Sequence, residues 1–182
     1  MTASGTVTSS TVTLSVDELR AVARVDGLLL PSMLLDDADL DAGLRDAVAV
    51  RGLLARGLVA LHADALVTTV SLAALLSPLR APGAVAELER EAAGVRLRTA
   101  AVEGPGGLLM LVEREPDVWI LELRAEELAV LLVPLLEECT GGDEGLLALA
   151  RRDGTTYVLD QAQWDTGEQA LSATAALLAS AP

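Results

Sequence analysis

The residue types that most often carry nucleophilic chemistry are scarce in this sequence, which holds one histidine and one cysteine. A serine or cysteine nucleophile needs a base, and only His62 is available for that role. His62 with Asp64 could form half of a relay, but a lone histidine next to an acid is usually a capped surface residue. Cys139 follows Glu137 and Glu138, whose negative charges disfavour the reactive thiolate. We therefore expect no catalytic residue and a non-enzymatic protein.

An acidic cluster is the best candidate for a metal site. Its members are Asp36, Asp37, Asp39 and Asp41. They are dense enough to attract Ca²⁺ or Mg²⁺, but they lack the D-x-D-x-D-G spacing and the distal glutamate that wrap one ion. Acidic residues also suit the positive end of a helix, so we interpret the cluster as a helix N-terminus. One histidine and one cysteine exclude the usual zinc sets, and we expect no metal and no other cofactor.

The charge balance bounds the possible partners. The chain has 13 Lys+Arg residues against 27 Asp+Glu residues, a formal charge of −14. Proteins that bind nucleic acid or anionic membranes rely on Lys and Arg, so this balance argues against both partners. Mean hydropathy is high at +0.45, yet no apolar run approaches the ~20 residues that cross a bilayer.

The N-terminal residues and the composition indicate where the protein acts. The first 19 residues contain no Lys or Arg and no continuous apolar segment, so they do not resemble a signal peptide. We therefore expect a cytoplasmic protein. The chain has no Lys, Asn or Phe and a large excess of Leu, Ala and Val, a bias typical of GC-rich coding that indicates an actinobacterial source.

The first half of the sequence predicts a strand followed by helices. Residues 6–14 are rich in β-branched types, which favours a strand after a frayed terminus at 1–5. Ser15 and Glu18 form a capping-box pattern that begins a helix, and Gly27 ends it. An apolar connector with Pro31 follows. Two further helices are expected over 40–58 and 64–76.

From residue 85 the period changes to alternation, which predicts an antiparallel meander. Its four strands are expected at 85–91, 95–102, 108–114 and 118–124. The positions expected to face the core are Val95, Leu97, Leu109, Leu111, Trp119, Leu121 and Leu123. The positions expected to meet water are Arg96, Arg98, Glu113 and Glu122. Because Leu108, Met110 and Val112 alternate with two further leucines, both faces of the sheet should be covered.

The last part of the sequence contains a helix, a loop, a hairpin and a final helix. Residues 125–139 are strongly apolar, and Pro134 should kink or restart that helix. Asp153-Gly154 predicts a hairpin between 146–152 and 155–161, although 145–152 could equally begin a helix. Thr166 and Gln169 form a second capping-box pattern before the final helix. The fold class is α+β, with an antiparallel sheet flanked by helices in a single domain over 1–182.

The order of these pieces resembles the EspG family of type VII secretion chaperones. The resemblance covers residues 6–138. It is carried by L-S-V-D-E-L-R at 14–20, G-L-L-L-P at 27–31, A-V-R-G-L-L-A-R-G-L-V ending at 59, L-A-A-L-L-S-P-L-R-A-P at 72–82, V-W-I-L-E-L at 118–123 and an apolar helix at 126–136. The chain departs from the family by its shorter length and by little similarity after Cys139.

The resemblance implies a non-enzymatic cytosolic protein with a central antiparallel sheet flanked by helical bundles. Members of the family hold the helical tips of PE–PPE type substrate pairs in solution before export. For this chain it implies a chaperone or adaptor that binds a helical secreted substrate, either with a trimmed fold or with two chains combined as a homodimer.

No residue of the family's binding surface is carried over, so the candidate contacts come from the meander itself. Met110 is adaptable, Trp119 is the largest anchor, and Arg96 and Arg98 are expected to be exposed cations that orient an acidic partner. Two other functions stay open. One is an acidic immunity or toxin-neutralising protein that captures a basic enzyme through the −14 charge. The other is a winged-helix-like regulator.

Overall fold

A computed structural model describes residues 11–35, 42–92, 94–128, 130, 131, 144–153, 156–166, 169, 172, 173 and 176. Its elements, in chain order, are β1 (Thr11–Ser15), α1 (Val16–Asp26), η1 (Ser32–Leu34), α2 (Ala42–Ala55), β2 (Val59–His62), β3 (Ala65–Thr68), α3 (Val70–Leu75), η2 (Ser77–Arg80), β4 (Ala84–Ala92), β5 (Val95–Gly104), β6 (Gly107–Glu115), β7 (Val118–Arg124), β8 (Gly145–Asp153) and β9 (Thr156–Trp164).

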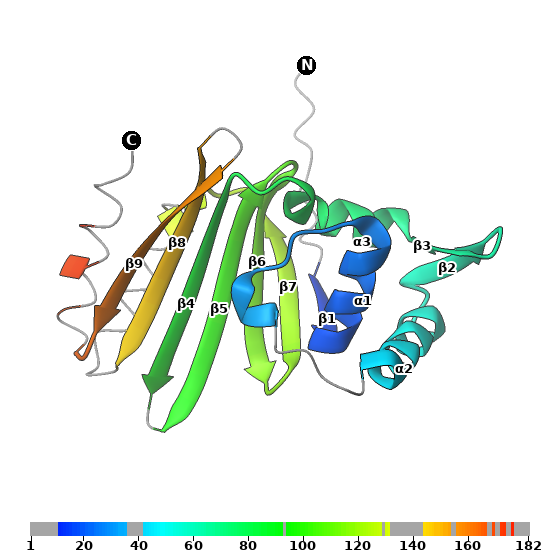
Figure 1. Ribbon diagram of the computed structural model, residues 1–182, viewed down its shortest axis with the longest axis horizontal. Helices are drawn as coiled ribbons and strands as arrows, with labels where there is room; N and C mark the ends of the chain where they lie inside the picture. The colour runs from blue at the N-terminus through cyan, green and yellow to red at the C-terminus, as the bar shows by residue number, and fades with distance from the viewer. Residues whose placement is uncertain are drawn as a thin grey trace, which may run out of the picture.

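Seven strands form one antiparallel sheet in the order β1-β7-β6-β5-β4-β8-β9 (Figure 1). The predicted meander is confirmed as β4 to β7. The predicted hairpin is also confirmed, because β8 pairs with β9 from Gly145↔Trp164 to Asp153↔Thr156, and the helical alternative for 145–152 is wrong. The sequence did not indicate that this hairpin joins the meander through β4. The α+β class is confirmed.

Helix α1 begins and ends as its sequence predicts. The Ser15 side chain accepts a hydrogen bond from the amide of Glu18 (3.2 Å), and the Glu18 carboxylate accepts one from the amide of Ser15 (3.0 Å). Gly27 adopts the left-handed conformation (φ 65°), which glycine adopts at little cost. Helix α1 therefore starts directly after β1 and packs against one face of the sheet.

The predicted helix over 64–76 is wrong in its first half. Residues 59–68 form the β2–β3 hairpin, and only α3 is helical. Ala63 and Asp64 both have positive φ (48° and 65°), the backbone of a tight hairpin turn. Val67 and Thr68 are β-branched and favour the strand, so the helix starts only after Thr69, its N-cap.

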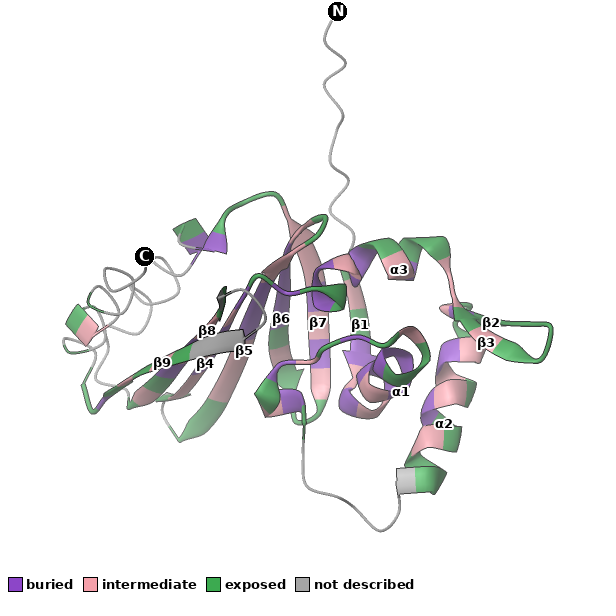
Figure 2. Cartoon of the chain, turned by 45° about the horizontal axis from the view of Figure 1, so that its top comes forward, coloured by how far each residue is buried: buried purple, intermediate pink, exposed green. Residues whose placement is uncertain are grey.

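The sheet has an apolar cluster on each face. We call the face that packs on α1 the front face, and its buried strand residues are Leu14, Ala100, Val102, Leu109, Leu111, Trp119 and Leu121. The buried residues of the back face are Ala84, Ala86, Leu88, Ala101, Leu108, Met110, Leu147, Leu149 and Trp164, with Leu128 and Leu131 packed on them. The expectation that both faces are covered is confirmed for β5 and β6 (Figure 2).

Some positions expected in the core or in water lie elsewhere. Val95 is 57% exposed, because it begins β5 at a sheet end, and Leu97 and Leu123 are half-buried. Arg98 and Glu113 were expected in water, but their side chains are only 16% and 9% exposed. The cause is the connector at 28–35, which crosses the front face above them and which strand alternation alone does not reveal.

Several predictions fall on residues outside those described. They concern residues 6–10, the aspartate cluster at 36–41, residues 132–139 with Pro134 and Cys139, the turn at 154 and 155, and most of the final helix. In the second capping-box pattern, the Gln169 side chain accepts a hydrogen bond from the amide of Asp165 (3.1 Å), whereas the pattern predicts one from the amide of Thr166.

Candidate protein interface

The inner part of the front face holds a buried ion pair. The Arg98 guanidinium donates to both carboxylate oxygens of Glu113, at 2.7 Å for the Nε contact, and lies 5.4 Å from the centre of the Trp119 ring. The amide of Asp117 also donates to Glu113 (3.2 Å). The hydrogen bond from Arg98 lowers the pKa of Glu113 below its ordinary value, although burial opposes the shift.

The η1 segment is fastened to the sheet above this pair. The Glu87 carboxylate, from β4, accepts from the Ser32 hydroxyl (2.6 Å) and from the amides of Ser32 and Met33. Arg98 donates to the carbonyl of Met33 (3.4 Å). Two charged side chains on neighbouring strands thus hold one short segment, which covers the front face above Arg98.

The four residues expected to contact a partner occupy different environments. Trp119 is fully buried on the front face and Met110 is 4% exposed on the back face, so the sheet separates them. Arg98 is brought against Trp119 and is covered by η1. Arg96 is the accessible one, with 63% of its side chain exposed.

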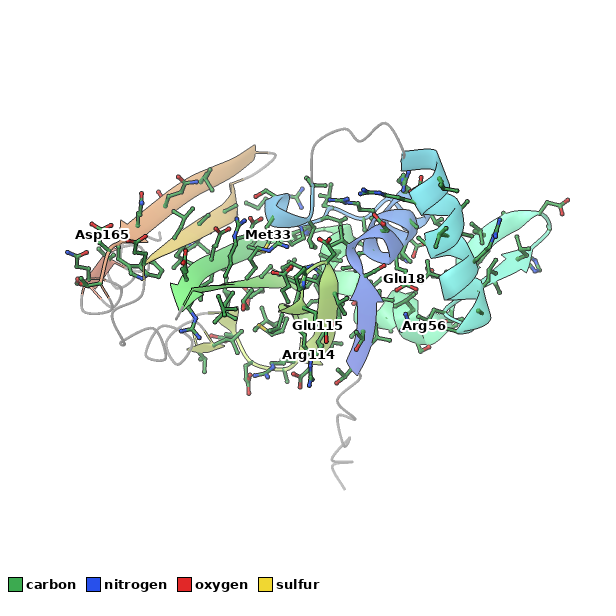
Figure 3. All side chains as sticks on the ribbon, turned by 90° about the horizontal axis from the view of Figure 1, so that it is seen from below. Glu18, Met33, Arg56, Arg114, Glu115 and Asp165 are labelled. Carbon is green, nitrogen blue, oxygen red and sulfur yellow. The ribbon has the colours of Figure 1, made fainter. Side chains whose placement is uncertain are left out.

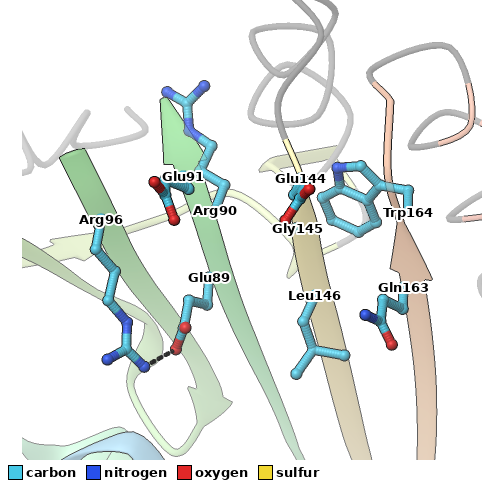
Figure 4. Close-up of a pocket in the computed structure, with 9 residues that line it drawn as sticks. All are labelled: Glu89, Arg90, Glu91, Arg96, Glu144, Gly145, Leu146, Gln163 and Trp164. Carbon is cyan, nitrogen blue, oxygen red and sulfur yellow. Dashed lines mark hydrogen bonds and ion pairs between the residues drawn. The ribbon is translucent and has the colours of Figure 1, made fainter. Parts of the chain in front are cut away.

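Arg96 lies at one end of the sheet beside an open cavity of about 520 Å³ (Figure 4). It donates to Glu89 of β4 (2.6 Å), and this hydrogen bond raises the pKa of Arg96, which keeps its charge. The cavity continues to Leu146, Gln163 and Trp164 of the β8–β9 hairpin.

A glycine shapes this end of the hairpin. The Trp164 indole lies against Gly145, where any Cβ would collide with the ring. Trp164 is 1% exposed, and its indole nitrogen has no hydrogen-bond partner within the described part of the chain. The close packing of Trp164 on the back face fixes which side chains of β8 and β9 point forward, since successive residues alternate between faces.

The outer part of the front face carries the residues that alternate with this back-face core. We call it the open face, and it consists of Leu146, Ala148 and Ala150 of β8 with Leu159, Gln161 and Gln163 of β9. Leu146 is 38% exposed and Leu159 is 59% exposed, while the two alanines are half-buried. Figure 1 shows α1 and η1 in front of the other end of the sheet, whereas β8 and β9 are in open view.

The open face is suited to contact with another protein. It exposes two leucines, Leu146 and Leu159, on one side of a sheet, and burial of such apolar surface favours association with another protein. Among the described residues, no group of three or more His, Cys, Asp or Glu is placed to hold a metal ion. In the same part of the chain, no helix has the length and apolar character needed to span a bilayer.

The comparisons with known proteins agree with this architecture. No protein-family model and no curated protein matches the chain. A solved structure does match, that of the Mycobacterium tuberculosis type VII secretion system chaperone EspG5 in complex with a PE25–PPE41 dimer. The match has a TM-score of 0.56 and 11% identity, and covers 87% of this chain and 84% of that chain. The two proteins share a fold. The high coverage of both chains means that the likeness extends beyond one motif.

Sequence reasoning missed the open face. It placed the candidate contacts in the meander, while the accessible apolar residues lie on the hairpin that follows. A signal was present, because L-L-A-L-A at 146–150 is apolar at every position and therefore apolar on both sides of a strand. What the sequence did not reveal is that the described helices cover only one part of the front face.

Proposed function

We propose that this protein is a non-enzymatic cytoplasmic chaperone or adaptor of a type VII secretion system, which binds a helical secreted protein of PE–PPE or related type. The fold likeness to EspG5 over most of both chains carries the proposal. That chaperone is in complex with a PE25–PPE41 dimer, so the shared fold can hold a protein partner.

We propose the open face as the partner-binding surface. Ala148 and Ala150 form a floor of small side chains, which lets a helix approach the sheet closely. Leu146 lies at one end of this row on β8, Leu159 lies beside Ala150 on β9, and both exposed leucines would pack against the apolar stripe of that helix. Burial of exposed leucines stabilises a complex without strong dependence on salt.

Of the four residues expected from the sequence to contact the partner, Arg96 remains in this proposal. It lines the same cavity as Leu146, with strand β4 between the two residues, and is largely exposed, so it can face an acidic residue of the partner (Figure 4). Its ion pair with Glu89 holds the guanidinium in place.

An acidic immunity or toxin-neutralising protein is the alternative, favoured by the charge of −14. Such a protein would capture a basic enzyme through long-range attraction, which salt screens. The two functions therefore differ in how salt affects the complex.

The test is co-expression of the full chain with helical secreted proteins encoded beside it, followed by size-exclusion chromatography with light scattering at low and at high salt. We expect a complex that persists at high salt. Leu146→Glu should weaken it at least about tenfold, because a charge would be buried against apolar surface.

Val70→Glu is the matched control, since Val70 is an apolar residue of α3 that is 87% exposed and lies away from the open face. It should leave binding unchanged. Loss of the complex in high salt, or equal loss with both variants, would contradict the proposal and favour the acidic alternative or another surface.

A further inference from the structure

The two edges of the seven-stranded sheet differ in their protection. At one edge, β1 has five residues, and Arg56 donates to the carbonyl of Thr13 while Glu18 accepts from the amide of Ser15 (3.0 Å). Arg56 also pairs with Glu18 (3.0 Å), as Figure 3 shows. Side chains therefore already occupy hydrogen-bonding groups of this edge, which blocks the addition of another strand there.

The other edge, β9, has none of these devices among the described residues. It is nine residues long, contains no proline and pairs with β8 in a continuous register. Edge strands of this length without proline, bulge or lysine are templates for pairing with a further strand. The single charged residue of β9 is Asp160, whose half-buried side chain belongs to the back face and is the one feature of this strand that opposes edge pairing.

The hydrogen bonds of β8 show which groups of β9 are available. The amide of Arg152 donates to Gly83 (2.8 Å) and the amide of Glu91 donates to Glu144 (3.0 Å), so even-numbered residues of β8 bond to β4. In an antiparallel ladder the bonding direction alternates, so the odd-numbered residues of β8 bond to the even-numbered residues of β9. The backbone groups of Leu159, Gln161 and Gln163 therefore point away from β8, toward the outer side of the last strand of the sheet.

We propose that β9 pairs with β9 of a second copy of this chain, antiparallel about a two-fold axis at Leu159. The pairing would join the two sheets into one continuous sheet. Leu159 is 59% exposed in the single chain, and this register places it against its own counterpart, where the two apolar side chains cover each other.

The alternative registers are less favourable. An axis at Asp160 would set two carboxylates opposite each other, which is destabilising on one face of a strand pair. An axis at Gln161 would leave each Leu159 opposite Gln163, with no apolar neighbour. Two identical β9 edges paired in this register cover the exposed Leu159 of each chain with the other, and this match is the reason that we assign the position to a second copy.

The dimer has a structural consequence for the open face. A two-fold axis perpendicular to the sheet keeps both front faces on the same side. The exposed residues of β9 in the two copies would then adjoin, and the two open faces would become one surface. The dimer itself rests on the edge alone and does not require the proposed function.

The first experiment is sedimentation equilibrium of the full chain over a range of concentrations. We expect a dimer, and Leu159→Lys should raise the dissociation constant at least about a hundredfold, because edge lysines oppose strand pairing. Leu146→Lys is the matched control, since it makes the same change on β8, inside the sheet, and should leave the dimer intact. Circular dichroism verifies that both variants fold.

The second experiment fixes the register by cross-linking in a Cys139→Ser background. Leu159→Cys should form an intermolecular disulfide on mild oxidation, because hydrogen-bonded partners have Cα atoms about 5.5 Å apart. Gln163→Cys should not, because its two copies would lie about 27 Å apart at the ordinary strand rise. A chain that stays monomeric at high micromolar concentration, or that cross-links through Gln163→Cys instead, overturns the proposal.

Discussion

The inner and outer parts of the front face have similar strands but different surroundings. Over β5 to β7, the face packs on α1 and η1 and buries Trp119 completely. Over β8 and β9, the same face exposes Leu146 and Leu159. Both parts contain a strand that is apolar on both sides, at 108–112 and at 146–150, so the strand pattern does not decide which becomes core. A distant segment, the connector at 28–35, decides it by covering one part and not the other.

Two ion pairs on β5 repeat this contrast. Arg98 pairs with Glu113 beneath η1, with side chains 16% and 9% exposed. Arg96, two residues earlier on the same face, pairs with Glu89, with side chains 63% and 37% exposed. A solvent-exposed ion pair contributes about 0–1 kcal/mol to stability. Breaking a buried ion pair is more destabilising, because it leaves a buried charge without an opposite charge beside it. The Arg98–Glu113 pair therefore contributes to the stability of the fold, whereas the Arg96–Glu89 pair lies on the surface and contributes little to it.

The two parts of the front face should differ most in how much the free energy of unfolding falls when a large side chain is truncated. Trp119→Ala should lower the free energy of unfolding by about 3–5 kcal/mol, since it leaves a cavity in the closed part and removes the ring beside Arg98. Gln163→Ala, on the open face, should change it by less than about 0.5 kcal/mol. Urea denaturation of both variants measures the two values, and equal losses would contradict the division into core and surface.

The next largest effect concerns the ion pairs. Glu113→Gln should lower the free energy of unfolding by about 2–3 kcal/mol, because it leaves Arg98 charged and covered by η1. Glu89→Gln is the matched change at the exposed pair and should cost less than about 1 kcal/mol. A Glu89→Gln variant as unstable as Glu113→Gln would show that the depth of the two pairs does not govern their contribution.

Lowering the pH should remove the stability that the Arg98–Glu113 ion pair provides. The pKa of Glu113 is lower in the folded chain than its ordinary value of 4.5, so the folded state binds fewer protons there than the unfolded state does. The stability that the pair provides is therefore complete above that value and is lost as pH falls through the lower, folded pKa. Urea midpoints measured from pH 6 to pH 3 should fall less steeply for Glu113→Gln than for the natural chain.

Much of the fold followed from local patterns. The capping box at Ser15 and the turn at Gly27 bounded α1, and alternation located β4 to β7. These features depend on residues close together in the chain. The β2–β3 hairpin was missed because A-L-V-T at 65–68 fits a short helix as well as a strand, and pairing with residues 59–62 decided between them.

The candidate site was much less predictable. Arg98 and Glu113 look like solvent residues in sequence, because each is a charged member of an alternating strand. Their burial depends on η1, which is 65 residues from Arg98 in sequence where the two meet at Met33. Leu146 is a leucine in an apolar strand, yet nothing among the described residues covers it fully, and it is 38% exposed. Non-local packing therefore decided the burial of these three residues.

The change expected to weaken binding most should have only a small effect on stability. Leu146→Ala should lower the free energy of unfolding by less than about 1 kcal/mol, because the side chain is already 38% exposed and its removal opens no enclosed cavity. The same change should weaken the proposed partner complex, since it removes the apolar surface that a helix would cover. Urea denaturation and light scattering on one preparation measure both. A large loss of stability with unchanged binding would place Leu146 with Trp119 in the core, and would remove the distinction between the two parts of the front face.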